Sequence, residues 1–182
     1  MDYFSVDRRN AYRLSEPISL ETNRPPRNEI EAHIFSQFPN GFSRHGAQFF
    51  RDAPAQPQTP DDVNSGYIEL LLELIRRAHY PDKPSRYVSM FATDALERAQ
   101  QFRATNGHPS HGIYVLRTDG AVHRGDMHLL KFEQSVAATE HRLHLYWQGR
   151  TFDGVPNHVA FWEYVLALPV QVAEKVACGS GS

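Results

Sequence analysis

Near its C-terminal end the chain reads VAFWEYVLAL over residues 159–168, then Pro169, then VQVAEKV over residues 170–176. Both runs are apolar and rich in β-branched and aromatic side chains, and a proline interrupts a hydrogen-bond ladder, so they predict two strands. Glu163 is an isolated acid in the first run. Its aromatic neighbours point to the opposite face, because side chains alternate along a strand. Glu163 is therefore either a functional carboxylate or a glutamate at an exposed or edge position.

The strongest helical pattern lies in the middle of the chain. Apolar side chains recur there at helical spacing and predict a core helix that carries Tyr67, Leu70, Leu71, Leu74, Ile75 and Ala78. The preceding residues 52–63 hold three prolines and almost no apolar side chain. That composition predicts a surface loop.

Shorter elements surround this helix. Helices are predicted after an Asn28 cap, over residues 95–103 after a Thr93 or Asp94 cap, and over residues 134–147 ending at Gly149. Strands are predicted over residues 11–14, 86–91, 112–117, 121–123 and 128–132, with a hairpin turn at residues 118–120. Because helices and strands do not alternate regularly, the pattern favours an α+β fold with a mostly antiparallel mixed sheet flanked by helices.

Length and composition predict one soluble globular domain. The chain has 182 residues, of which 41% are hydrophobic and 22% charged. We assign residues 1–177 to the domain and residues 178–182, which contain the single cysteine, to a tail or expression remnant.

The charge and hydropathy of the chain exclude some functional classes. The formal net charge is -2, which provides no overall basic field for bulk nucleic-acid binding. Residues 1–11 are polar and lack the apolar run of a signal peptide, and no apolar stretch is long enough for a membrane segment.

Three separated segments resemble the bacterial toxin mono-ADP-ribosyltransferases of the cholera and pertussis type. The first contains Tyr12-Arg13, Asn23-Arg24-Pro25-Pro26, Asn40-Gly41-Phe42 and Gly46, the second is the segment Tyr87-Val88-Ser89-Met90-Phe91, and the third is Trp162-Glu163-Tyr164-Val165-Leu166. They follow the family's order of Arg, Ser and Glu over nearly the whole chain. The resemblance implies an ADP-ribosyltransferase-like split, mixed or antiparallel β-sheet with flanking helices.

Three departures from the family pattern bear on the assignment of roles. Ten residues separate Arg13 from Arg24, a longer spacing than in the toxins. Met90 and Phe91 stand where the family has the last two residues of Ser-Thr-Ser. Phe161 stands two residues before Glu163, where family members that modify arginine have a second acid, so arginine is disfavoured as the acceptor.

The resemblance assigns a role to each matched residue. Glu163 would stabilise the oxocarbenium-like state that forms when the ribose–nicotinamide bond breaks, because a nearby carboxylate offsets its positive charge. Arg13, or failing that Arg24, would bind the phosphates of NAD through its planar fork of donors. Ser89 would hold the glutamate or the ribose. Nicotinamide would stack on an aromatic ring, for which the candidates are Tyr87, Phe91 and Tyr146.

The implied function is a mono-ADP-ribosyltransferase that consumes NAD as a substrate and releases nicotinamide. Its partner would be a host protein acceptor, with a hydroxyl such as a threonine of ubiquitin as one branch. The resemblance also implies a bacterial virulence effector, secreted or injected into the host cytosol. The alternatives are a NAD glycohydrolase, a nucleic-acid-modifying transferase, and a binding module that has kept the fold without activity.

Two other kinds of site are disfavoured by the sequence. The histidine pairs His108/His111 and His141/His144 have spacing that only suggests a metal site, and no cysteine supports them, so no metal is expected. No G-x-G-x-x-G motif is present, which argues against a dinucleotide bound by a Rossmann crossover.

Overall fold

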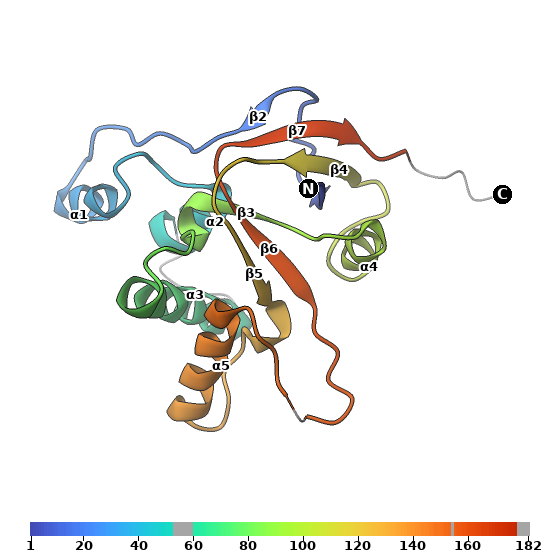
Figure 1. Cartoon of the computed structure of the whole chain (residues 1–182). Coiled ribbons are helices and arrows are strands. Elements are labelled where there is room, and N and C mark those ends of the chain that lie inside the picture. Colours follow the sequence, from blue (N-terminus) through green and yellow to red (C-terminus); the bar gives the residue numbers. More distant parts are fainter. Residues whose placement is uncertain (53–59, 154, 178–182) are drawn as a thin grey trace.

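The structure is a computed structural model that describes residues 1–52, 60–153 and 155–177; the side chains of residues 60–65 are outside this description. Within these ranges the chain forms an α+β fold with two antiparallel sheets and five α-helices (Figure 1). None of the described helices combines the length and hydrophobicity of a membrane span. The tail assigned to residues 178–182 lies outside the described residues.

The larger sheet has four strands in the order β1-β4-β7-β2. These are β1 (Tyr3–Asp7), β4 (Gly112–Arg117), β7 (Val170–Lys175) and β2 (Pro17–Ile18). The smaller sheet has the order β3-β6-β5, with β3 (Ser89–Ala92), β6 (Trp162–Ala167) and β5 (Val122–Asp126). Backbone hydrogen bonds between Phe4 and Thr93, each 2.8 Å from N to O, connect the two sheets.

The helices cover different parts of this framework. They are α1 (Glu29–Gln37), α2 (Arg44–Gly46), α3 (Pro60–His79), α4 (Leu96–Asn106) and α5 (Val136–Gln148). Short turns of other helix types occur at Ala47–Arg51 (η1), Arg86–Val88 (η2) and Met127–Leu129 (η3). In Figure 1, α3 and α5 lie beside each other against the smaller sheet, and α4 packs on β1.

Strand β6 has a different core on each of its faces. Tyr164 and Leu166 point into a cluster with residues of the larger sheet, including Leu116 and Val172. Val165 points the opposite way, into a cluster formed mainly by α3 and α5. The alternation expected along residues 159–168 is therefore present, but both faces are covered, and Glu163 lies on the face of Val165.

Several predicted elements are confirmed. The pattern around Tyr67 lies in α3, and Asn28 caps α1 by accepting a hydrogen bond from the backbone N–H of Glu31. Helix α5 ends at Gly149, which adopts φ 69° in the left-handed region that favours glycine. Residues 112–117 form β4, and Pro169 separates β6 from β7.

The predicted hairpin over residues 112–123 is wrong. Strand β4 pairs with β1 and β7, whereas β5 pairs with β6 in the other sheet. The turn signal at residues 118–120 is local, and the choice of partner depends on distant apolar strands. For the same reason the single mixed sheet is replaced by two antiparallel sheets.

The strand predicted over residues 11–14 is also wrong. The first strand is β1, and the residues after it turn back because the Asp7 carboxylate accepts backbone N–H groups of Arg9 and Tyr12 at 3.2 and 2.8 Å. Residues 128–132 form no strand, because Asp126 caps the η3 turn through the N–H of His128.

Several boundaries differ from prediction. Neither Thr93 nor Asp94 caps α4, whose N-cap is Ala95, because Thr93 pairs with β1 and Asp94 accepts from Tyr164. The predicted strand over residues 86–91 starts with the η2 turn. Helix α3 begins at Pro60, inside the loop predicted over residues 52–63, and residues 53–59 lie outside the described part of the chain.

The buried His123 makes stability depend on pH. Its Nε2 donates to the Tyr146 carbonyl at 2.9 Å, and burial lowers its pKa to about 4. As the pH falls from about 6.5 to 4, the unfolded state binds a proton that the folded state excludes. We expect urea denaturation to show that the free energy of unfolding falls by about 3 kcal/mol over this window, at about 1.4 kcal/mol per pH unit. The free energy of unfolding of His123→Gln should fall by less. Equal pH dependence in both proteins would contradict this.

Candidate functional site

A cavity of about 550 Å³ opens beside the N-terminal end of β6. Its wall combines β1 and the loop that follows it, the α2–η1 segment, β3, part of α4 and the start of β6. These segments are far apart in the sequence. The volume is within the range of cavities that bind cofactors and other small molecules.

Glu163 lies in the wall of this cavity and is only 6% exposed. It belongs to the central strand of the smaller sheet, so the alternative of an exposed or edge glutamate is wrong. Oε1 accepts hydrogen bonds from Arg86 Nη1 and from the Tyr146 hydroxyl, the latter at 2.8 Å. No group in the described part of the chain donates to Oε2. One oxygen is thus anchored while the other is available to a ligand.

Arg86 joins Glu163 to a second buried acid. Its Nη2 and Nε donate to Glu69 Oε1 and Oε2 at 2.8 and 2.9 Å, in a bidentate pair. The guanidinium carbon lies 4.3 Å from the ring centre of Phe91. Burial disfavours the charged guanidinium, but the Glu163 and Glu69 carboxylates outweigh it and raise the pKa of Arg86 well above its ordinary value. Arg86 is therefore a fixed cation.

His45 approaches the same network from α2. Its Nε2 lies 3.1 Å from Glu69 Oε2, without the alignment of a hydrogen bond. Burial works against ionisation of Glu69, but Arg86 and then His45 lower the pKa of its carboxyl group. Glu69 is thus held as an anion next to the cavity.

Tyr146 reaches Glu163 because β5 has a glycine at the point of contact. Gly125 pairs with Glu163 across the sheet, and a Cβ atom at this position would overlap the Tyr146 ring. Burial, with a further contribution from Glu163, raises the pKa of Tyr146 well above its ordinary value. The hydroxyl therefore remains protonated and donates to the carboxylate.

Some of the other candidate residues from the sequence line the cavity and others do not. Arg13, Ser89 and Phe91 line it together with Glu163. Arg13 is exposed, and Ser89 is fully buried, with its hydroxyl donating to the Ser85 carbonyl at 2.7 Å and not to Glu163.

Arg24 and Tyr87 do not line the cavity. Arg24 forms a bidentate pair with Glu31 at 2.6 and 2.7 Å, at the start of α1. Tyr87 is 1% exposed and packs among the aromatic rings of Phe38 and Phe50. These two candidates are therefore part of the structural framework around α1 and η2.

Other residues at the cavity had no signal in the sequence. Arg9 and Arg44 lie at its mouth, and neither guanidinium forms an ion pair with a described residue. Arg86 precedes the Tyr87 segment but matches no motif. Its importance arises from burial between two distant acids, which a local pattern does not reveal.

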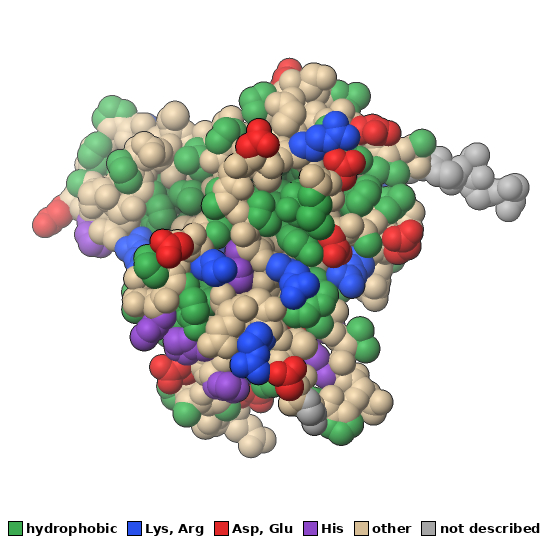
Figure 2. All heavy atoms as spheres, in the orientation of Figure 1, with side chains coloured by type: hydrophobic (Ala, Val, Ile, Leu, Met, Phe, Trp, Pro, Cys, Tyr) green, Lys and Arg blue, Asp and Glu red, His purple; other side chains and the backbone are tan. Residues whose placement is uncertain are grey.

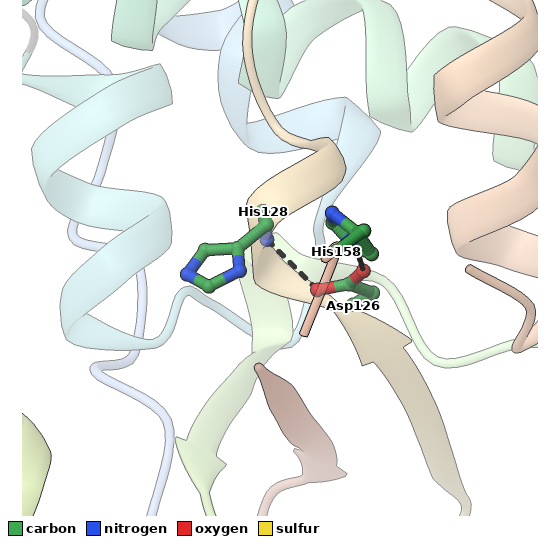
Figure 3. Close-up of side chains that lie close together, drawn as sticks. All are labelled: Asp126, His128 and His158. Carbon is green, nitrogen blue, oxygen red and sulfur yellow. Dashed lines mark hydrogen bonds and ion pairs between the residues drawn. The ribbon is translucent and has the colours of Figure 1, made fainter. Parts of the chain in front are cut away.

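A second cluster of polar groups, Asp126, His128 and His158, has ligand atoms within 4.8 Å of one another (Figure 3). Asp126 is fully buried, and its oxygens accept from the backbone of His128 and Phe161, the Thr151 hydroxyl and His158 Nε2. His128 Nδ1 donates to the Val159 carbonyl, and Figure 3 shows its ring turned away from His158. These hydrogen bonds account for the cluster as an anchor of the segment before β6.

Residues 3–177 match a family model described as "Protein of unknown function (DUF2441)". The chain belongs to the DUF2441 family. The matched range includes every cavity-lining residue of this DUF2441 domain. No curated protein matches the chain at a significant level.

The close packing of Gly125 on Tyr146 in this DUF2441 domain gives a test of the site geometry. We expect Gly125→Ala to displace the ring and lower the unfolding free energy by about 1–3 kcal/mol, because a packed site does not absorb an extra methyl group. Gly66→Ala is the control, since a Cβ there meets no atom within 4 Å and lies in α3. Chemical denaturation measures both, and a Gly125→Ala protein as stable as the control would contradict the geometry.

Proposed function

We propose that this DUF2441 member is a mono-ADP-ribosyltransferase that consumes NAD, with Glu163 as the catalytic carboxylate. The observation that carries the proposal is the position of Glu163 in a cavity wall, with Oε1 anchored and Oε2 unbonded among the described residues. Such a carboxylate is suited to accept a ribose hydroxyl and to stabilise positive charge on the sugar.

The charge around Glu163 favours a cationic ligand. Glu69 and Glu163 contribute two carboxylates, whereas Arg86 contributes one guanidinium. This network has one excess negative charge when His45 is neutral. The nicotinamide ring of NAD carries a positive charge, and the sugar becomes positive as the bond to nicotinamide breaks. Stabilisation of developing charge by fixed groups is strong where water is excluded.

The basic residues at the cavity mouth suit the phosphates of NAD. Arg9, Arg13 and Arg44 line the cavity on the side of α2 and the loop after β1. Arg24 is already paired with Glu31. We therefore assign phosphate binding to Arg13 in preference to Arg24 and add Arg9 and Arg44. Phe91 is the aromatic residue that we assign to nicotinamide, because neither Tyr87 nor Tyr146 lines the cavity.

The arrangement of strands supports the ADP-ribosyltransferase-like fold as part of this proposal. Ser89 starts β3, and β3 pairs with the glutamate-bearing β6 in a sheet separate from that of β1. The strand expected to carry Arg13 is replaced by β1, which ends six residues earlier, so Arg13 reaches the cavity from a loop.

Aromatic side chains line the cavity near Glu163, at the position where arginine-modifying family members have a second acid. Phe161 lines the cavity two residues before Glu163, and its ring centre lies 6.2 Å from that of Phe102. No second acid stands at this position to activate an arginine. We propose a protein hydroxyl, such as a threonine of ubiquitin, as the acceptor, and a bacterial effector delivered to host cytosol as the setting. On the face drawn in Figure 2, acidic and apolar side chains are interspersed with basic ones. A mixed surface of this kind is compatible with a protein partner.

The first test is transfer of label from NAD. The protein is incubated with NAD labelled in the adenylate part and a host-cell lysate, and we expect a discrete labelled acceptor band. Glu163→Gln keeps the size of the side chain and should reduce labelling by about 100-fold or more, as expected for loss of an electrostatic catalytic group. Full labelling by Glu163→Gln would exclude this residue. Nicotinamide release without an acceptor would favour the glycohydrolase, and NAD binding without turnover would favour an inactive module.

The second test separates the arginines. We expect Arg13→Ala, Arg9→Ala and Arg44→Ala each to raise the KM for NAD by about 10-fold, because each removes one charge-assisted hydrogen bond that contributes about 1.5 kcal/mol. Arg24→Ala is the matched control and should leave KM unchanged. Initial-rate kinetics of nicotinamide release measure all four variants. A rise in KM confined to Arg24→Ala would reverse the assignment.

A further inference from the structure

Four buried side chains from four separate elements meet at the wall of the cavity. They are Glu69 of α3, Arg86 of η2, Tyr146 of α5 and Glu163 of β6, and none is more than 6% exposed. Only Arg86 and Glu163 of the four line the cavity. The network therefore extends from the helical layer to the candidate site, where Arg86 and Glu163 face the cavity.

The hydrogen bonds of the network are asymmetric at Glu163. Arg86 Nη1 and the Tyr146 hydroxyl both donate to Oε1, and Arg86 Nη1 also lies 2.6 Å from the Tyr146 oxygen. Tyr146 thus accepts from Arg86 while it donates to Glu163. A carboxylate held through one oxygen by two donors at different angles has little freedom to rotate, which fixes the direction of Oε2.

We propose that Arg86 and Tyr146 are positioning residues that clamp Oε1 of Glu163 and direct Oε2 at the substrate, with Glu69 holding Arg86 in place. The inference rests on the proposed function, because it assigns a catalytic consequence to this geometry. It gives Arg86 and Tyr146 the role that the sequence predicts for Ser89. The Ser89 hydroxyl donates its one hydrogen bond to the Ser85 carbonyl, so it cannot also donate to Glu163.

Glu69 acts on the site only through Arg86. Its two oxygens occupy the Nε and Nη2 edge of the guanidinium, which leaves Nη1 directed at Glu163 and Tyr146. The central carbon of the guanidinium lies 4.3 and 5.4 Å from the ring centres of Phe91 and Tyr146. A lysine would keep the charge and lose this fixed fork of donors.

The network also contributes to folding, so the test must separate position from stability. Arg86→Gln alone leaves two buried acids without their cation and is expected to destabilise the protein strongly. The double variant Glu69→Gln/Arg86→Gln removes one acid as well and should recover part of the lost melting temperature. Tyr146→Phe keeps the ring and removes one donor. Glu73→Gln is the control, because Glu73 is a buried acid one turn along α3 that pairs with Arg76 and Arg77 and does not line the cavity, and glutamine keeps an oxygen to accept from the Ser85 hydroxyl.

The readouts are melting temperature and the separate kcat and KM of nicotinamide release. We expect Tyr146→Phe to lower kcat by about 10-fold with little change in KM for NAD, since a hydrogen bond to a charged group contributes about that factor. The double variant should recover stability relative to Arg86→Gln but keep a kcat about 100-fold below that of the wild type. Glu73→Gln should lower the melting temperature and leave kcat unchanged.

Two results would overturn the clamp while the proposed function stands. One is an active wild type with unchanged kcat in Tyr146→Phe and in the double variant. The other is a kcat that follows melting temperature across the whole set, the control included. A wild type that releases no nicotinamide would instead reject the proposed function. Crystal structures of the variants test the positioning role directly. A Glu163 carboxylate that rotates in Tyr146→Phe supports the clamp, and a carboxylate that keeps its orientation contradicts the clamp.

Discussion

Arg86 forms a bidentate pair with Glu69 and a second ion pair with Glu163. These two pairs connect three parts of the molecule that local forces do not bring together. Glu69 lies on a long helix, Arg86 in a short turn before β3, and Glu163 in the central strand of the smaller sheet. Burying two acids is costly unless a cation and further hydrogen bonds compensate them. Once α3 and β6 are in place, the guanidinium has one position that satisfies both acids, and the candidate site takes its shape from that requirement.

The division into two sheets explains why a cavity forms next to this ion pair. Strand β6 is packed on both faces along most of its length, by the larger sheet on one side and by α3 and α5 on the other. Near the start of β6, the loop after β1 and the short α2 segment take the place of α3 and α5. The polar side chains of these two segments line a cavity there. Glu163 lies where the packed layers end. Its neighbours on the strand are core residues, and its carboxylate meets both the core and the cavity.

The proposed ADP-ribosyl transfer depends on electrostatics more than on a local motif. With His45 neutral, two fixed acids and one fixed cation create a site that favours positive charge, and arginines at the mouth of the cavity favour phosphate. NAD is a ligand that carries both kinds of charge. In the proposed reaction, Glu163, Arg86 and Tyr146 of this chain act as one unit.

The sequence by itself determined the elements with strong local signals: α3 from its apolar spacing, the Asn28 and Gly149 caps, and the strands on either side of Pro169. It also singled out Glu163 as an acid in an apolar strand. Only the tertiary structure decided which strands pair, because β4 and β5 select distant partners over the nearby turn between them. It likewise placed Arg24 and Tyr87 away from the cavity and brought Arg86 to Glu163. Arg86 lies 60 positions before Tyr146 and 77 positions before Glu163, and the paired strands are likewise distant in the sequence, so no local pattern carries that information.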